Sequence, residues 1–101
     1  MIQICNLRKE KPVYEYDIKV DRSNKILGNP YYMNTESERD LVCEKYKLWI
    51  YQKLLQKDKA VIDELNRIIK IYKKHNKLRL FCWCAPKRCH AETIKEIIER
   101  N

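Results

Sequence analysis

The run LRLFCWC, residues 78–84, is the feature of this chain that most constrains its fold. It is apolar except for one arginine, and it has the length of a buried strand rather than of a helix. Pro86 ends the run, and residues 91–100 then carry Ile94, Ile97 and Ile98 at helical spacing. A buried strand that leads into an amphipathic helix is typical of an α/β domain, so we expect this strand to lie centrally in a sheet.

Periodicity predicts the other elements. Residues 1–7 and residues 13–20 alternate between apolar and polar side chains, which predicts two strands, the second with only one apolar face. Residues 35–57 have apolar side chains every three or four positions and predict a helix. Asp58 is placed to cap a second helix, which ends near residue 75 among basic side chains.

The order of these elements predicts a single domain over residues 1–101. A chain of 101 residues can bury one modest core but not two. We therefore expect a small α/β domain of two or three layers, with a short, mostly parallel sheet and about three helices.

The net charge of +8 favours anionic partners, among them nucleotides, nucleic acid and acidic surfaces. The lysines are spread along the chain rather than gathered in one block, so a solvated basic surface explains the same composition. Both interpretations stay open on composition alone.

Five cysteines make an odd number, and no signal peptide or long apolar stretch precedes them. A transmembrane helix needs about 20 apolar residues in succession, and the sequence contains no such run. These features predict a cytoplasmic protein with free thiols and no membrane association. They say nothing about its oligomeric state.

Residues 21–34 predict a long loop without a period of its own. Gly28, Asn29 and Pro30 form the strongest turn signal of the chain, and Tyr31 and Tyr32 follow them. A loop of this length is unusual in so small a domain and is often functional.

The corner after the last strand concentrates groups that could carry chemistry. Cys82, Cys84, Cys89 and His90 are together a possible zinc ligand set. Structural zinc sites, however, usually take pairs of ligands from two separate turns, whereas these four share one corner. We therefore expect no metal here and no other cofactor.

A reactive thiol is a second interpretation of this corner. Cys89 lies near the start of the last helix beside Lys87 and Arg88, and both features lower a thiol pKa, while the adjacent His90 is a candidate base. Cys82 and Arg88 also have the C-x5-R spacing of the tyrosine-phosphatase phosphate loop. That loop usually contains glycine, and this one has none, so the match is weak.

Binding of an anion without covalent chemistry is a third interpretation, and the one we favour. The N–H groups and the dipole at the start of the last helix point beyond the carboxyl end of the strand, where α/β sheets usually bind ligands. Lys87 and Arg88 add positive charge there. A purely structural role stays open, because Cys82 and Cys84 are small apolar residues that suit a buried strand.

The ending LFCWCAPKRCHAETI resembles the closing signature of a family catalogued as domain of unknown function 4326, found in phages, viruses and bacteria. Three earlier segments also resemble this family: IQICNLRK, VDRSNKILGNPYY and SERDLVCEKYKLWI. The family has a glycine where this chain has Asp21. The resemblance implies no particular reaction, but it marks these positions as matching the family pattern: Asn6, Arg22, Gly28, Asn29, Pro30, Arg39, Cys82, Cys84, Pro86, Cys89 and His90.

These segments suggest a single pocket, in which two arginines would bind a phosphate or a carboxylate and an aromatic ring would stack on a base. We expect a small phage- or virus-related domain that binds an anionic small molecule, namely a nucleotide or nucleotide derivative. The expected ligand-binding residues are Asn6, Arg22, Gly28, Asn29, Pro30, Arg39, Lys87 and Arg88. One alternative is an enzyme that acts on a nucleotide or glycosidic bond with Cys89 and His90 as catalytic residues. Another is a basic protein that binds nucleic acid.

Overall fold

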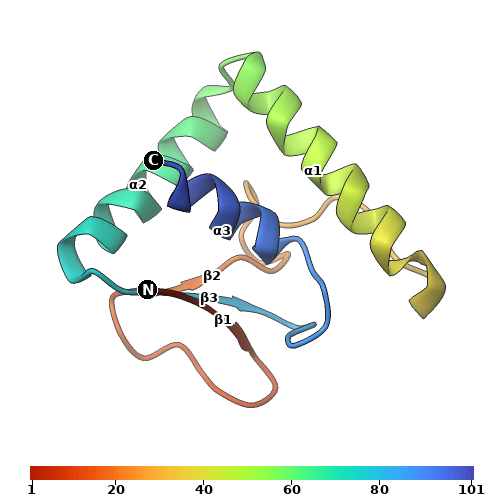
Figure 1. Cartoon of the computed structure of the whole chain (residues 1–101), viewed down its shortest axis with the longest axis horizontal. Coiled ribbons are helices and arrows are strands. Elements are labelled where there is room, and N and C mark those ends of the chain that lie inside the picture. Colours follow the sequence, from red (N-terminus) through yellow and green to blue (C-terminus); the bar gives the residue numbers. More distant parts are fainter.

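The computed structural model describes all 101 residues and confirms the expected α/β fold. A sheet of three parallel strands and three α-helices make up the domain (Figure 1). In chain order the elements are β1 (Ile2–Asn6), β2 (Asp17–Lys19), the short 3-10 helix η1 (Glu36–Glu38), α1 (Arg39–Leu55), α2 (Lys59–His75), β3 (Leu78–Cys82) and α3 (Ala91–Glu99).

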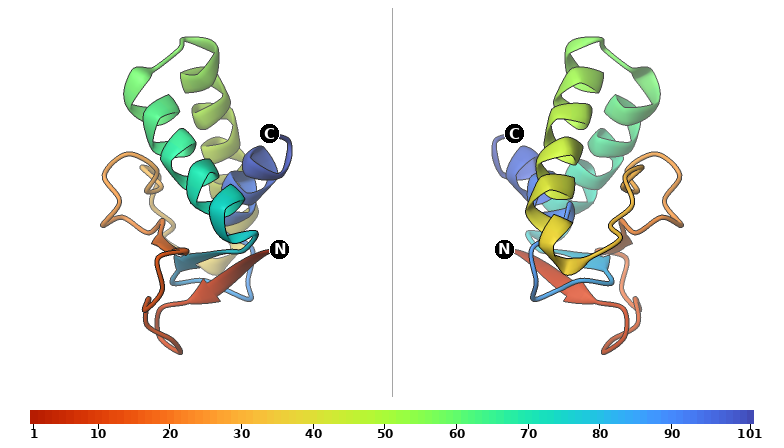
Figure 2. Two further views of the ribbon diagram at one scale, coloured as in Figure 1. Left: turned by 90° about the vertical axis from the view of Figure 1, so that its left-hand side faces the viewer. Right: turned by 90° about the vertical axis from the view of Figure 1, so that its right-hand side faces the viewer.

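The predicted position of the last strand is confirmed, because β3 lies between β1 and β2. Parallel strands need crossover connections, and here the two crossovers lie on opposite faces of the sheet. Residues 7–16 connect β1 to β2 below the sheet, and the α1–α2 hairpin connects β2 to β3 above it (Figures 1 and 2). The helix α3 lies on the same side as α1 and α2, so the domain has two layers of regular structure.

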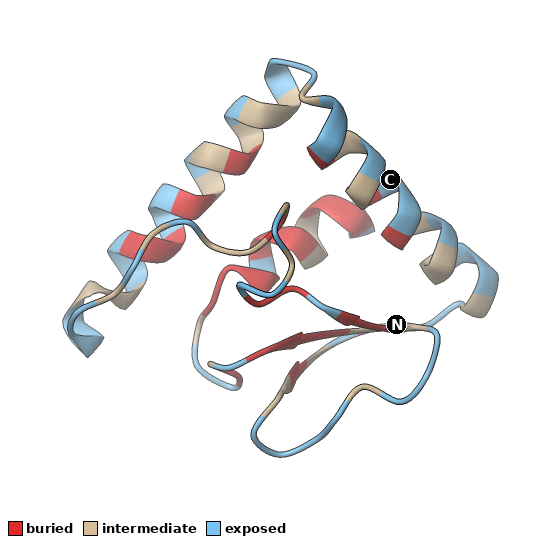
Figure 3. Ribbon diagram, turned by 180° about the vertical axis from the view of Figure 1, so that it is seen from behind, coloured by how far each residue is buried: buried red, intermediate tan, exposed pale blue.

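The core lies between the sheet and the helices. Along β3, Leu78, Leu80 and Cys82 alternate toward the helices and are buried there. The apolar positions predicted in the last helix, Ile94, Ile97 and Ile98, are confirmed in this core, to which α2 contributes Val61, Leu65 and Ile68. Figure 3 shows the buried segments of the helices turned toward the strands.

The prediction of a strand over residues 13–20 is wrong for its first half. Only Asp17–Lys19 pairs with β3, while Val13 and Tyr14 are exposed. The reason is Asp17, whose carboxylate accepts the N–H groups of Val13 at 2.9 Å and Tyr14 at 3.0 Å. These bonds fold the segment into a turn, so it cannot pair with β3 as a strand. They also bury the Asp17 carboxylate, which the alternating pattern had predicted to lie on the exposed polar face.

The helix predicted over residues 35–57 is observed as α1 with η1 before it. The Glu38 carboxylate accepts the Thr35 N–H at 3.0 Å, which fixes the entry of the chain into α1. The predicted cap of α2 is confirmed, since the Asp58 carboxylate accepts the Val61 N–H at 3.1 Å. No helix combines the length and the apolar composition that crossing a bilayer requires.

Candidate functional site

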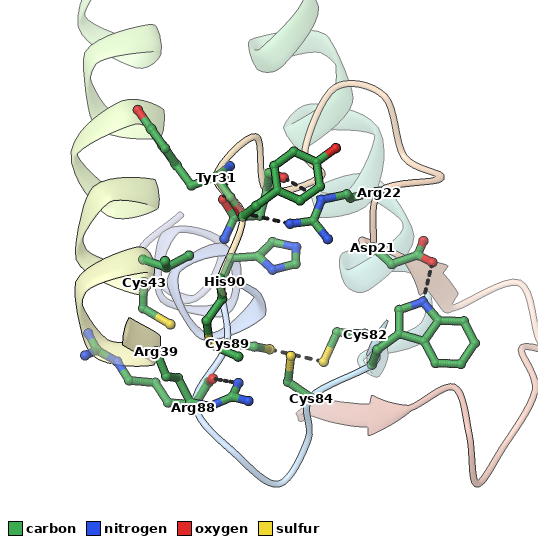
Figure 4. A pocket seen from close by; sticks show the side chains of 15 residues that line it. Asp21, Arg22, Tyr31, Arg39, Cys43, Cys82, Cys84, Arg88, Cys89 and His90 are labelled. Carbon is green, nitrogen blue, oxygen red and sulfur yellow. Dashed lines mark hydrogen bonds between the residues drawn. The ribbon is translucent and has the colours of Figure 1, made fainter. Parts of the chain in front are cut away.

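A pocket of about 320 Å³ lies at the carboxyl end of the central strand (Figure 4). Three segments enclose it: the loop after β2, the first turns of α1, and the corner between β3 and α3. This is the edge of a parallel sheet at which α/β proteins usually bind ligands. The lining residues are Asp21, Arg22, Asn29, Tyr31, Tyr32, Met33, Arg39, Val42, Cys43, Cys82, Trp83, Cys84, Arg88, Cys89 and His90.

Arg22 contributes an unneutralised positive charge to this pocket. Its guanidinium donates to two backbone carbonyls, that of Asn29 at 3.1 Å and that of Tyr31 at 2.8 Å. It also lies over the Tyr32 ring, 4.2 Å from the ring centroid. None of its hydrogen bonds or ion pairs is to a carboxylate. The side chain is therefore held in place, while its charge has no carboxylate partner and its Nη1 group has no hydrogen-bond partner in the chain.

Asp21 faces the same pocket, but its oxygens are occupied. Ser23 donates to one oxygen through its hydroxyl at 2.5 Å, and the Trp83 indole donates to the other at 2.9 Å. Burial alone would raise the pKa of Asp21, but these hydrogen bonds outweigh it and the net shift is downward. The carboxylate thus fixes the Trp83 ring, half-exposed, at the edge of the pocket.

Arg39 and Arg88 are already paired. Arg39 holds Glu36 through two hydrogen bonds of 2.6 and 3.0 Å and donates to the Arg88 carbonyl at 2.9 Å. Arg88 contacts Asp40 at 3.1 Å and Glu44 at 2.8 Å. Both guanidinium groups connect the corner to α1 and η1, so a ligand would meet charges that neighbouring carboxylates already neutralise.

Two thiols meet at the base of the pocket. The sulfurs of Cys82 and Cys89 are 3.1 Å apart, and both side chains are buried. The thiol of Cys89 and the N–H groups of Cys84 and Ala85 donate to the Cys82 sulfur, and together they outweigh burial and lower its pKa to about 6. Donation to Cys82 raises the pKa of Cys89, and burial raises it further. Cys82 is accordingly the more acidic thiol of the pair, with Cys89 as its hydrogen-bond partner.

His90 is a buried, neutral side chain that connects two elements. Its Nε2 lies 2.5 Å from the Val20 carbonyl oxygen, and since a carbonyl only accepts, Nε2 carries the proton. Burial lowers the pKa of His90, which keeps the ring uncharged near neutral pH. The ring packs edge-on against Tyr46, with centroids 4.9 Å apart. No hydrogen bond links this ring to the Cys89 thiol, whose partner is Cys82.

The start of α3 does not offer the free N–H groups that the sequence suggested. The N–H of Ala91 bonds to the Cys89 sulfur, that of Glu92 to the Cys89 carbonyl at 3.1 Å, and that of Thr93 to the His90 carbonyl at 3.0 Å. The N–H groups at the start of α3 are therefore already hydrogen-bonded within the corner, so the positive charge that attracts a ligand must come from side chains.

The expected turn at Gly28 shapes the loop from outside the pocket. Gly28 has no positive φ; instead a Cβ at this position would lie 2.7 Å from the Asn24 carbonyl oxygen and 2.8 Å from that of Asp21. Glycine is required because the backbone packs against itself. The Asn29 carboxamide oxygen accepts the Tyr31 N–H at 2.9 Å and so directs Tyr31 toward the pocket.

Ten residues were expected to bind ligand or act in catalysis, and six line this pocket: Arg22, Asn29, Arg39, Arg88, Cys89 and His90. Gly28, Pro30, Lys87 and Asn6 are not among the lining residues. Lys87 pairs with Glu36 at 3.6 Å. Asn6 donates to the Ala85 carbonyl at 2.6 Å and accepts the Arg8 N–H at 2.8 Å, which ties β1 to the corner.

Sequence reasoning missed Asp21, Met33, Val42 and Cys43 as lining residues. A signal existed for Cys43, which follows Arg39 by four positions and so lies on the same face of α1. No comparable pattern marks Asp21, whose place in the pocket depends on the fold of the loop. No group of three or more His, Cys, Asp or Glu side chains is arranged to hold a metal ion.

Residues 5–100 match the family described as Domain of unknown function (DUF4326). The chain belongs to this family. The match covers nearly the whole domain, including both the Gly-Asn-Pro turn and the Cys-His corner, which confirms the resemblance drawn from the sequence. No curated protein and no solved structure matches the chain.

Proposed function

We propose that this member of the DUF4326 family binds a small anionic molecule, a nucleotide or nucleotide derivative, in the pocket beyond β3. The observation that carries the proposal is the Arg22 guanidinium, held by two carbonyls and without a carboxylate partner. A phosphate would accept from its free Nη1 group and neutralise its charge.

The aromatic groups of the pocket support a ligand with a flat ring. Trp83 is fixed by Asp21, and Tyr31 and Tyr32, which follow the Gly-Asn-Pro turn, also line the pocket. Any nucleobase can stack on such a ring, because every base has a flat π-face. The volume of about 320 Å³ is at the lower end of the range for small-molecule sites, which suits a mononucleotide better than a dinucleotide.

His90 supplies the pocket with a hydrogen-bond acceptor. Because Nε2 carries the proton, Nδ1 has a free lone pair, and no donor in the chain contacts it. A ribose hydroxyl or an exocyclic amino group would donate to this atom. His90 therefore serves ligand binding in this proposal, as an orienting group.

The enzyme alternative receives less support from the geometry. Cys89 is bonded to Cys82, and His90 to Val20, so no nucleophile–base pair of the expected kind is assembled. We also propose an intracellular setting, since all five cysteines are free thiols. The link to phages and the binding of nucleic acid stay predictions of the sequence.

A thermal-shift panel of purine and pyrimidine mononucleotides, with the matching nucleosides and inorganic phosphate, tests the proposal. A ligand present at 100 times its Kd adds about 2.7 kcal/mol of stability, which raises the Tm of a domain of this size by on the order of 10 °C. Arg22→Gln should weaken the nucleotide response about tenfold in Kd, and Arg22→Lys less. Lys70→Gln, an exposed position on α2, is the matched charge control. Equal responses of all four proteins, or none to any nucleotide, would overturn the proposal.

A further inference from the structure

Four of the five cysteines line one pocket, and nucleotide binding gives them no role. Cys43, Cys82, Cys84 and Cys89 all border it, whereas Cys5 lies on β1 away from it. Two of the four are in direct contact, with sulfurs 3.1 Å apart. This separation is about 1 Å longer than a disulfide bond, so a small approach of the two side chains would allow the bond to form.

We propose that Cys82 and Cys89 form a redox-active dithiol, which a peroxide converts into a disulfide at the base of the pocket. The inference concerns a modification site and does not depend on the identity of the ligand. Its basis is the sulfur–sulfur contact and the placement of both thiols on a cavity that solvent enters.

Cys82 is the residue that reacts first. Its sulfur accepts from the Cys89 thiol and from the N–H groups of Cys84 and Ala85, which stabilise the thiolate. Cys5 and Cys43 lack such a set of donors, and burial raises the pKa of both. Among the five free cysteines, Cys82 is thus the one whose hydrogen-bond donors favour the thiolate form.

The chemistry balances with hydrogen peroxide as the oxidant. The Cys82 thiolate attacks one peroxide oxygen, the O–O bond breaks, and the departing hydroxide takes up a proton to become water, which leaves a sulfenic acid on Cys82. The Cys89 sulfur then attacks the Cys82 sulfur, the S–O bond breaks, and the thiol proton leaves with the hydroxyl group as a second water. Two thiols are oxidised to one disulfide, and one peroxide is reduced to two waters.

Cys84 is a matched control that the chain itself provides. It lies two residues from Cys82 on the same pocket and is less buried than Cys82; its sulfur is bonded to the Arg39 guanidinium but contacts no other sulfur. If exposure alone determined oxidation, Cys84 would react before Cys82. The contact geometry predicts the reverse order.

Peptide mapping of the oxidised full-length protein tests the proposal. After mild peroxide treatment near neutral pH and alkylation, trypsin should release residues 80–87 joined to residues 89–95, and a dithiol reductant should separate them. The Cys84→Ser variant should give the same cross-link, whereas Cys82→Ser and Cys89→Ser should not. In the wild-type protein, thiol loss at Cys82 should be at least about tenfold faster than at Cys5.

In the wild-type protein the cross-linked peptide itself identifies the bond even if a serine variant fails to fold, because the cysteine of residues 80–87 that carries the alkyl group lies outside the disulfide. A cross-link between residues 80–87 and 89–95 that is lost in Cys84→Ser would assign the bond to Cys84 and overturn the proposal. Conversion of Cys82 to sulfinic acid without any cross-link would overturn it as well, because Cys89 would then fail to resolve the intermediate. The same cross-link formed equally fast in the denatured chain would show that the fold contributes nothing.

Discussion

Arg79 and Arg22 lie in different regions of this domain and are held in place in different ways. Arg79, on the face of β3 that residues 7–16 cover, donates two hydrogen bonds of 2.7 and 2.9 Å to Asp17 and a third of 3.0 Å to Glu10. Arg22, at the pocket, donates only to carbonyls. The first charge is neutralised within the fold, and the second is free for a ligand.

The difference shows that this domain uses a buried ion pair to fasten a connection that has no regular structure. The connection over residues 7–16 contains no regular structure, and the pair of Asp17 with Arg79 fastens it to the central strand. The side chain of Asp17 is fully buried and that of Arg79 is 13% exposed. Arg22, in contrast, is positioned by hydrogen bonds to backbone carbonyls, which leave its charge in place. Four predictions test this contrast.

Replacement of the two arginines by methionine gives the largest expected difference. Arg79→Met leaves the buried Asp17 carboxylate without its partner and should lower the free energy of unfolding by about 3–5 kcal/mol. Arg22→Met removes hydrogen bonds at an exposed side chain and should cost about 1 kcal/mol or less. Urea unfolding measures both. Similar losses in the two variants would contradict the contrast.

Acid should remove the stability that Asp17 contributes. Burial alone would raise the pKa of this carboxyl, but hydrogen bonds from Arg79, Val13 and Tyr14 lower it to about 2 in the folded protein. The pKa of Asp17 is lower in the folded protein than in the unfolded chain. Its contribution to the free energy of unfolding is therefore complete above the unfolded pKa and is lost as the pH falls through the folded pKa. A shift of this size amounts to about 2 to 3 kcal/mol, lost progressively between about pH 5 and pH 1.

Urea unfolding of the wild type and Asp17→Asn across this pH range isolates that contribution. The difference in stability between the two proteins should shrink as the pH falls. A difference that stays constant would mean that ionisation of Asp17 does not stabilise the fold.

A smaller effect is expected from the turn that positions the loop beside Arg22. Gly28→Ala would place a methyl group 2.7 Å from the Asn24 carbonyl oxygen, so the backbone must shift, at a cost of about 2 kcal/mol. Because Arg22 lies within the same turn, this variant should also weaken ligand binding. Unchanged thermal stability would contradict the close packing of this turn.

The smallest effect is expected at Tyr46, beneath His90. Its hydroxyl donates to the Leu27 carbonyl at 2.7 Å in the buried core. Tyr46→Phe removes one neutral hydrogen bond and should destabilise the protein by about 1 kcal/mol in thermal or urea unfolding. A loss above that of Gly28→Ala would show that the pocket depends on the core more than on its loop.

Much of the fold could be predicted because periodicity reports local structure. The run over residues 78–84 identified the central strand, and the spacing of Ile94, Ile97 and Ile98 identified the buried face of the last helix. The first half of the second strand could not be predicted. The segment does alternate, but the Asp17 carboxylate accepts N–H groups from the residues before it and so forms a turn. Asp17 is buried by its ion pair with Arg79, which is 62 positions away, and the neighbouring sequence gives no sign of that pair.

The sequence predicted which residues line the candidate site better than it predicted the contacts between them. The family pattern selected Arg22, Asn29, Arg39, Cys89 and His90, all of which line the pocket. It gave no sign that Cys89 bonds to Cys82, or that His90 bonds to Val20. These partners are set by the angle at which the corner enters α3, and sequence spacing does not determine that angle.

Protection of Cys84 from a thiol reagent tests the central claim most directly. Cys84 lines the pocket, is half-buried, and its sulfur contacts no other sulfur atom. Its alkylation rate therefore reports whether the cavity is filled. The account predicts that at least one nucleotide slows alkylation of Cys84, and that Arg22→Gln, which binds about tenfold more weakly, shows clearly less protection at a nucleotide concentration near the wild-type Kd. A rate unchanged by every nucleotide, or equal protection in Arg22→Gln, would contradict it.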